Sequence, residues 1–171
     1  MAFEKGALLI AAAGNESGPV GAPAVFDSVM AVSAIDGAGA LASFSNRGPE
    51  IELCAPGVDV LSTSPGGGYR RLSGTSMAGP HIAGVVALMC AANPDVDVDT
   101  IKQILMDTAI DLGTPGEDNT YGWGHVDAHA ACIAATVGFG EIEDTIVNAS
   151  WGDAPIEERR RVNYDHPDAF D

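Results

Sequence analysis

The chain has few basic residues for its length. Its 171 residues carry 8 Lys and Arg against 24 Asp and Glu, which gives a formal net charge of −16. Binding to phosphate requires clustered cations, so this shortage argues against nucleic acid as a partner. The acidic balance suits a protein kept soluble at high salt, a calcium-binding secreted protein or an ordinary acidic enzyme, and composition does not choose among them.

Cysteines are also few. Cys54, Cys90 and Cys132 are an odd number at wide spacing, without a C-x-x-C pair. This pattern excludes a disulfide framework and a cysteine metal site. Since each lies in an apolar stretch, all three are predicted to be small buried hydrophobic residues.

Long hydrophobic runs are missing as well. No stretch of about twenty apolar residues exists, so the sequence predicts neither a transmembrane helix nor a membrane partner. Residues 1–6 lack the basic and apolar regions of a signal peptide. The chain is nevertheless 46% hydrophobic with a mean hydropathy of +0.13, which is enough to bury the core of one modest domain.

The apolar segments that are present predict an α/β fold. Runs of strand length without alternation are typical of parallel strands buried on both faces, and they occupy residues 7–13, 28–35 and 51–54. A hairpin is predicted from segments 58–63 and 69–73, which flank a glycine-rich turn. Helices are predicted over residues 82–92, after Asp97 or Asp99 with Ile101, Ile104 and Leu105 inward, and over residues 127–135.

The segment Gly74-Thr75-Ser76-Met77-Ala78-Gly79-Pro80-His81 is the most informative of the chain. It puts Ser76 on a glycine-flanked turn just before the long apolar run, and therefore at the N-terminus of a helix. Free N–H groups and the helix dipole favour negative charge there, such as the oxyanion formed when a hydroxyl attacks a carbonyl. The alternative is that Thr75 or Ser76 is only a helix N-cap.

This octapeptide resembles the serine motif of the subtilisin-like serine proteases. Five further segments resemble the family in its usual order: residues 11–16, 20–23, 28–32, 43–49 and 55–60. The resemblance implies that residues 1–135 are the C-terminal half of a subtilase catalytic domain. It implies a three-layer α/β fold with a mostly parallel sheet flanked by helices, incomplete at the N-terminus.

The resemblance also implies roles for individual residues. Ser76 would be the nucleophile, and the side-chain amide of Asn15 would bind the oxyanion together with the backbone N–H of Ser76. One wall of the specificity pocket would consist of Ala12, Ala13 and Gly14, with Gly21 near the other side. Small residues there imply a pocket for bulky apolar or aromatic side chains of a peptide or protein substrate, with Glu16 at the rim.

The family's aspartate and histidine motifs do not occur in the 171 residues. None of the four histidines stands where the catalytic base would be expected, so the chain is predicted to be inactive alone. It is expected to begin in mid-domain, as a truncated gene model or as a half-protease that pairs with the missing N-terminal half. Residues 136–171 are predicted to be an acidic tail or the start of a truncated appended segment.

Further implications of the resemblance are secretion and calcium as a structural cofactor, although no residue of the sequence is assigned to a metal. Two rival hydrolase classes do not fit. Residues 74–78 read G-T-S-M-A instead of the G-x-S-x-G of α/β-hydrolases, and Gly79 stands where an S-x-x-K enzyme needs lysine. A non-enzymatic alternative remains open, namely a subtilase-derived fragment that binds extended peptides by backbone pairing at residues 69–73 or at the strand ends.

Overall fold

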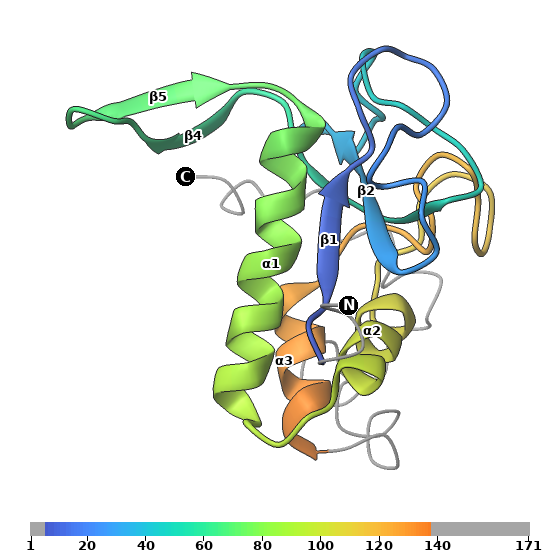
Figure 1. Ribbon diagram of the computed structural model, residues 1–171, viewed down its shortest axis with the longest axis vertical. Coiled ribbons are helices and arrows are strands. Elements are labelled where there is room, and N and C mark those ends of the chain that lie inside the picture. Colours follow the sequence, from blue (N-terminus) through green and yellow to red (C-terminus); the bar gives the residue numbers. More distant parts are fainter. Residues whose placement is uncertain (1–5, 138–171) are drawn as a thin grey trace.

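A parallel sheet flanked by helices forms the centre of the molecule. The computed structural model describes residues 6–137 (Figure 1). Its parallel sheet has the order β1-β2-β3, with β1 (Leu9–Ala12), β2 (Val29–Ile35) and β3 (Ile51–Pro56). An antiparallel hairpin, β4 (Val60–Thr63) and β5 (Tyr69–Leu72), leads into α1 (Thr75–Ala92), which α2 (Val98–Asp107) and α3 (Ala128–Val137) follow. The α/β prediction is therefore confirmed.

Different segments pack against the two faces of the sheet, as the side chains of β2 show. Every residue of β2 is buried, and successive side chains point to opposite faces. Met30 and Val32 belong to the main core, to which all three helices contribute, whereas Ala31 belongs to a smaller cluster with Val20 and Ala24. The loop after β1 therefore covers the face opposite the helices.

The first strand differs from its prediction. The sequence predicts a strand over residues 7–13 that is buried on both faces, but β1 covers only Leu9–Ala12 and all four residues are half-buried. The reason is that β1 pairs with β2 alone among the described residues and so lies at an edge of the sheet. The third strand is longer than predicted and continues to Pro56.

Helix α1 begins earlier than its apolar run suggests. Gly74 is the N-cap residue and has no side chain with which to cap the helix, so the N-cap explanation of Thr75 and Ser76 is wrong. Helix α2 follows its prediction closely: Asp97 accepts a hydrogen bond from Thr100 N at 2.9 Å, and the predicted inward residues are buried. This N-cap bond, together with one from the Thr100 hydroxyl, lowers the pKa of Asp97.

Helix α1 is also long and apolar enough to cross a membrane by length and composition alone, although 33% of the relevant residues are buried inside the molecule. The same criterion is met by core helices of globular proteins. Here α1 packs against β1, β2, β3 and α3, and Figure 1 shows it lying along the sheet. This packing identifies α1 as the central helix of the fold.

The prediction for the cysteines is right in one case and wrong in another. Cys54 is fully buried in β3, and this burial raises the pKa of its thiol well above its ordinary value. Cys132 is partly buried, and Cys90 is exposed. Cys90 fails the prediction because its neighbour Met89 takes the inward position on α1, and successive residues of a helix point about 100° apart.

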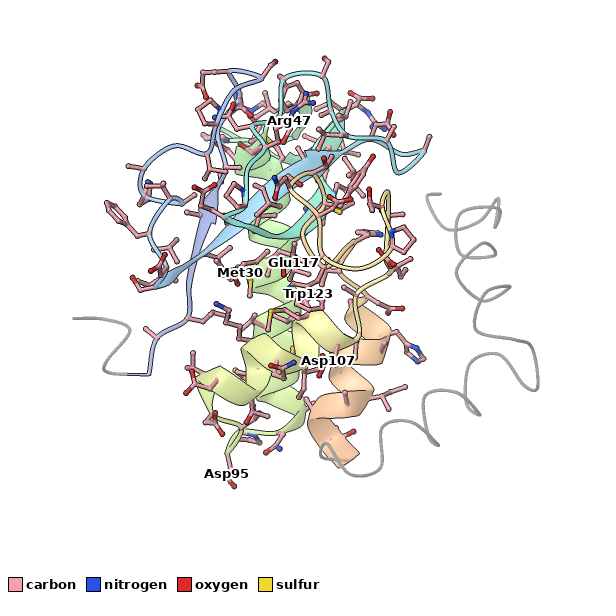
Figure 2. All side chains as sticks on the ribbon, turned by 90° about the vertical axis from the view of Figure 1, so that its right-hand side faces the viewer. Met30, Arg47, Asp95, Asp107, Glu117 and Trp123 are labelled. Carbon is pink, nitrogen blue, oxygen red and sulfur yellow. The ribbon has the colours of Figure 1, made fainter. Side chains whose placement is uncertain are left out.

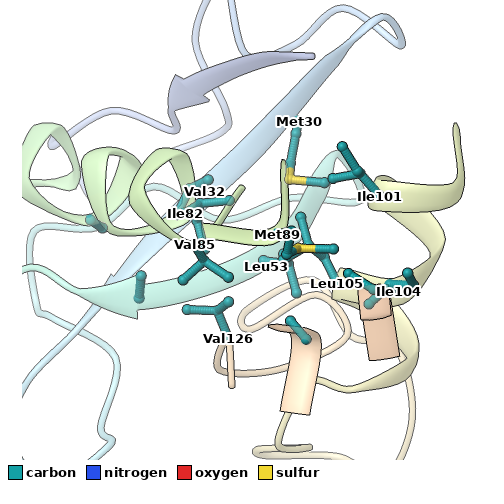
Figure 3. Close-up of a cluster of buried hydrophobic side chains, with 14 of the residues drawn as sticks. Met30, Val32, Leu53, Ile82, Val85, Met89, Ile101, Ile104, Leu105 and Val126 are labelled. Atoms are coloured by element: carbon teal, nitrogen blue, oxygen red, sulfur yellow. The ribbon is translucent and has the colours of Figure 1, made fainter. Parts of the chain in front are cut away.

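Met89 anchors the main core, where it lies with Leu53 and Leu105 (Figure 3). We expect Met89→Ala to lower the free energy of unfolding by about 2–5 kcal/mol, because it removes a fully buried side chain and leaves a cavity. Urea unfolding monitored by circular dichroism measures the loss. Leu88→Ala is the matched control: Leu88 is adjacent on α1 but 57% exposed, and it should cost at most about 0.5 kcal/mol. Equal losses would contradict this packing.

Candidate active site

Two loops distant in sequence meet at one end of the molecule. Asn15 follows β1, whose carboxyl end lies near the start of α1, and Ser76 is the second residue of α1 (Figure 1). The carboxyl ends of parallel strands are the usual place for ligand-binding loops. Asn15 and Ser76 are both exposed at this end.

Thr75 joins these two loops. Asn15 Oδ1 accepts hydrogen bonds from Thr75 N at 2.8 Å and from Thr75 Oγ1 at 3.0 Å, while Gly14 N donates to Thr75 Oγ1 at 3.2 Å. The amide oxygen of Asn15 therefore satisfies a free N–H at the start of α1. Its amide nitrogen is turned toward Gly74, where a side-chain Cβ would lie 3.5 Å from it. This end of the amide is the one available to a ligand.

The residues assigned to the specificity pocket also lie together. Gly21 N donates to Ala13 O at 3.1 Å, and Ala13 N donates to Val32 O at 3.0 Å. Ala13 is fully buried, Ala12 is half-buried at the end of β1, and Gly14 has a φ of +112° that side chains rarely adopt. The loop after β1 thus turns back on itself directly beside Asn15.

A cavity of about 280 Å³ opens beside Ser76. Helix α1 and strand β4 form its walls, and its lining residues are Val60, Leu61, Ser62, Ser76, Met77, Pro80 and His81. A ring nitrogen of His81, Nδ1, lies 2.8 Å from Met77 O in the same helix. Ser76 therefore stands at the edge of a largely apolar hollow.

Comparison with known proteins identifies the family of this chain. The model of the subtilase family matches residues 1–124. The chain belongs to the subtilase family. It is 52% identical over 127 residues to a halolysin-like extracellular serine protease of Natrialba magadii and 50% identical over 127 residues to a thermostable alkaline protease of Halalkalibacterium halodurans. It is 42% identical over 135 residues to subtilisin DY of Bacillus licheniformis.

These matches cover much of this subtilase chain but less of its relatives. They include 74%, 74% and 76% of the chain in the three comparisons, in the same order. The corresponding shares of the relatives are 23%, 34% and 48%. The chain therefore spans between about a quarter and a half of the length of the relatives it matches.

Two residues at the site of this subtilase are not identified by the sequence alone. The sequence suggests Thr75 only as a cap, although its hydroxyl bridges Gly14 and Asn15. Asn46 lies in segment 43–49, which resembles the family without a role for this residue, and it is almost fully buried against residues 13–18. The available signal is a polar residue in the connection between two buried strands, residues 36–50.

Among the histidines that the structure describes, His125 is one whose pKa is shifted by burial. Burial lowers its pKa below the ordinary value of 6.5; Asp127 acts against this lowering and His81 adds to it. As the pH falls, His125 is therefore protonated at a higher pH in the unfolded chain than in the folded one. The stability that depends on neutral His125 is complete above pH 6.5 and is lost as the pH falls through the lowered pKa.

We accordingly expect the free energy of unfolding to fall between about pH 8 and about pH 5.5, and to fall by more in the parent chain than in a His125→Gln variant. Urea unfolding midpoints at the two pH values measure the difference. His129→Gln is the control for loss of a histidine at an exposed position, because His129 is exposed on α3. A His125→Gln variant as acid-sensitive as the parent would contradict the assignment.

The described part of this subtilase presents no set of side chains suited to bind calcium. Residues 6–137 contain no group of three or more His, Cys, Asp or Glu side chains that could hold a metal ion. Glu50, Glu52 and Glu117 line a second cavity of about 440 Å³, but Glu52 Oε1 is bonded to Lys102 Nζ at 2.8 Å. Desolvation raises the pKa of Glu52, against the effect of Lys102. We assign no residue to calcium.

Proposed function

We propose that this subtilase chain supplies the nucleophile and an oxyanion donor of a serine endopeptidase. Ser76 Oγ attacks the scissile carbonyl of a peptide, the C–N bond breaks and the amine leaves with the proton of the hydroxyl. Water then hydrolyses the acyl-enzyme, which releases the acid and restores the Ser76 hydroxyl. The negative oxygen of the intermediate is bound by Asn15 Nδ2 and by the backbone N–H of Ser76. The observation that supports this most is the bonding of Asn15 to Thr75, the neighbour of Ser76 in sequence.

The base that takes the proton from Ser76 must come from elsewhere. The aspartate and histidine motifs of subtilases do not occur in the 171 residues. His81 and His125 do not stand in the family's histidine motif, so neither is proposed as the base. We therefore propose that efficient hydrolysis requires the polypeptide that carries these motifs, and that the chain alone retains only residual catalysis.

Substrate selection follows from the loop after β1. The proposed pocket is bounded at this loop by Ala12, Gly14 and Gly21, while Ala13, which is fully buried and accepts from Gly21 N at 3.1 Å, supports this wall from behind. The small side chains there leave room for a bulky apolar or aromatic residue. Peptides and proteins are the substrates. Because the relative from Natrialba magadii is named an extracellular protease, secretion is part of the proposal; nucleic acids and membranes are not proposed as partners.

A second function is favoured by the hairpin. All four residues of β5 are exposed, and β5 pairs only with β4 among the described residues. An extended peptide could add to its open edge by backbone hydrogen bonds without any chemistry. This would make the chain a peptide-binding fragment.

Reaction with a fluorophosphonate probe separates the two functions. The probe is added to the chain alone and to the chain mixed with a polypeptide that carries the subtilase aspartate and histidine motifs. We expect a covalent adduct on Ser76 in the mixture, located by mass spectrometry and lost in Ser76→Ala. Peptide binding without an adduct in either sample would contradict the endopeptidase and support the binding fragment.

A further inference from the structure

Asn46, between β2 and β3, uses its whole side chain to hold the loop after β1. Its Oδ1 accepts hydrogen bonds from Glu16 N at 2.9 Å and Gly18 N at 3.0 Å. Its Nδ2 donates to Ala13 O at 3.1 Å and to Glu16 Oε2 at 2.8 Å. An asparagine amide can make two bonds through each end, so all of its capacity is used. Asn46 is 2% exposed, and its bond to Ala13 O is buried.

The loop is shaped around this side chain. Asn46 N donates to Gly14 O at 3.0 Å, and a Cβ placed on Gly14 would collide with Asn46 Nδ2. Gly14 therefore has to be glycine for two reasons, its φ of +112° and the amide that occupies the space of a side chain. Such close contact leaves the loop little freedom to move independently of Asn46.

Asn15 is the predicted oxyanion donor in this loop. Asn46 forms hydrogen bonds to residues on both sides of Asn15 in the sequence. Asn46 binds Ala13 before it and Glu16 after it. Glu16 Oε2 accepts from Asn46 Nδ2 and also from Asn15 N at 2.9 Å, so the carboxylate carries the restraint to the Asn15 backbone. Asn46 therefore acts on Asn15 through these neighbours.

We propose that Asn46 is a positioning residue, which fixes the backbone of Asn15 so that its amide meets Thr75 on one side and the substrate oxygen on the other. The proposal rests on the proposed function. An oxyanion donor stabilises the transition state only if it is held in place before charge develops. Removal of the Asn46 donors leaves the buried Ala13 O and the carboxylate of Glu16 without this partner, and the loop is expected to rearrange.

Asn46→Asp tests the proposal with little change of shape. It keeps both acceptors but replaces the Nδ2 donors by an oxygen that repels the Glu16 carboxylate. Hydrogen–deuterium exchange in the 171-residue chain is followed at Thr75 N, which bonds to Asn15 and not to Asn46. We expect exchange there to quicken by roughly tenfold or more. Adding Glu16→Gln should slow it again, because glutamine can donate to the introduced carboxylate and still accept from Asn15 N.

Asn93→Asp is the matched control. Asn93 also holds a loop through its amide, with Nδ2 donating to Ala135 O at 2.9 Å and Oδ1 accepting from Asp95 N at 3.2 Å. Asp95 lies at the end of the molecule opposite to Arg47, the chain neighbour of Asn46 (Figure 2). Parental exchange at Thr75 in Asn46→Asp, or equal quickening in Asn93→Asp, would overturn the proposal.

A kinetic measurement distinguishes positioning from a merely structural role. In the chain assembled with the polypeptide that carries the aspartate and histidine motifs, Asn46→Asp should lower kcat by up to about 10²-fold with KM near the parent value. A change in KM alone would overturn the proposal. If the parent forms no adduct at Ser76, the proposed function fails, and the exchange at Thr75 still decides whether Asn46 positions Asn15.

Discussion

Replacing Asn15 with leucine is expected to slow acylation of Ser76 by about 10²- to 10³-fold, the loss established for such a donor in a subtilisin. Leucine has nearly the size of asparagine but cannot donate to the oxygen on which negative charge develops. Because this charge is small in the bound substrate, peptide affinity should change little. The measurement is kcat/KM on a chromogenic peptide for the assembled protease, with KM taken separately.

Asn15→Asp separates donation from positioning. Aspartate keeps an oxygen for Thr75 N, which Asn15 Oδ1 binds at 2.8 Å, but has no N–H for the oxyanion. It should therefore be about as slow as leucine, whereas a parental rate in Asn15→Asp would mean that Asn15 only supports the start of α1. Asn93→Leu, remote from the site, is the control for general destabilisation and should keep the parental kcat.

The fold could be predicted where the signal is local. The hairpin followed from one glycine-rich turn, and α2 from Asp97 with three apolar residues at helical spacing, because these patterns lie within a few neighbouring residues. The edge position of β1 and the exposure of Cys90 could not be predicted, since both depend on which other segments cover a surface. Local sequence specifies the elements, but burial depends on the whole arrangement.

The candidate site divides in the same way. Ser76 and Asn15 each lie in a short segment that resembles a family motif, so both can be identified without knowing their distance in space. Asn46 cannot, because its side-chain partners lie 28 to 33 residues away in sequence. The role of Thr75 is equally hidden, because its hydroxyl reaches across 60 residues to Asn15 instead of capping its own helix. Residues that position others thus emerge only from coordinates.

Gly124 carries the second large effect, this time on stability. Its φ is +127°, and a Cβ placed there would collide with the backbone carbonyl of Ile110. Its own carbonyl accepts from Cys54 N at 2.9 Å, which ties the segment before α3 to the buried strand β3. We expect Gly124→Ala to lower the free energy of unfolding by about 3–5 kcal/mol, measured by urea unfolding, because backbone cannot move aside as a side chain can.

Gly116→Ala isolates the contribution of the collision. Gly116 has a φ of +86° in the preceding loop, but a Cβ there would meet nothing within 4 Å. Its substitution should cost only the conformational strain, about 1–2 kcal/mol. If the two variants unfold at the same urea concentration, the approach of Gly124 to Ile110 does not limit stability. A clearly larger loss at Gly124 would mean that the approach to the Ile110 backbone, together with the more extreme φ of +127°, is what requires glycine there.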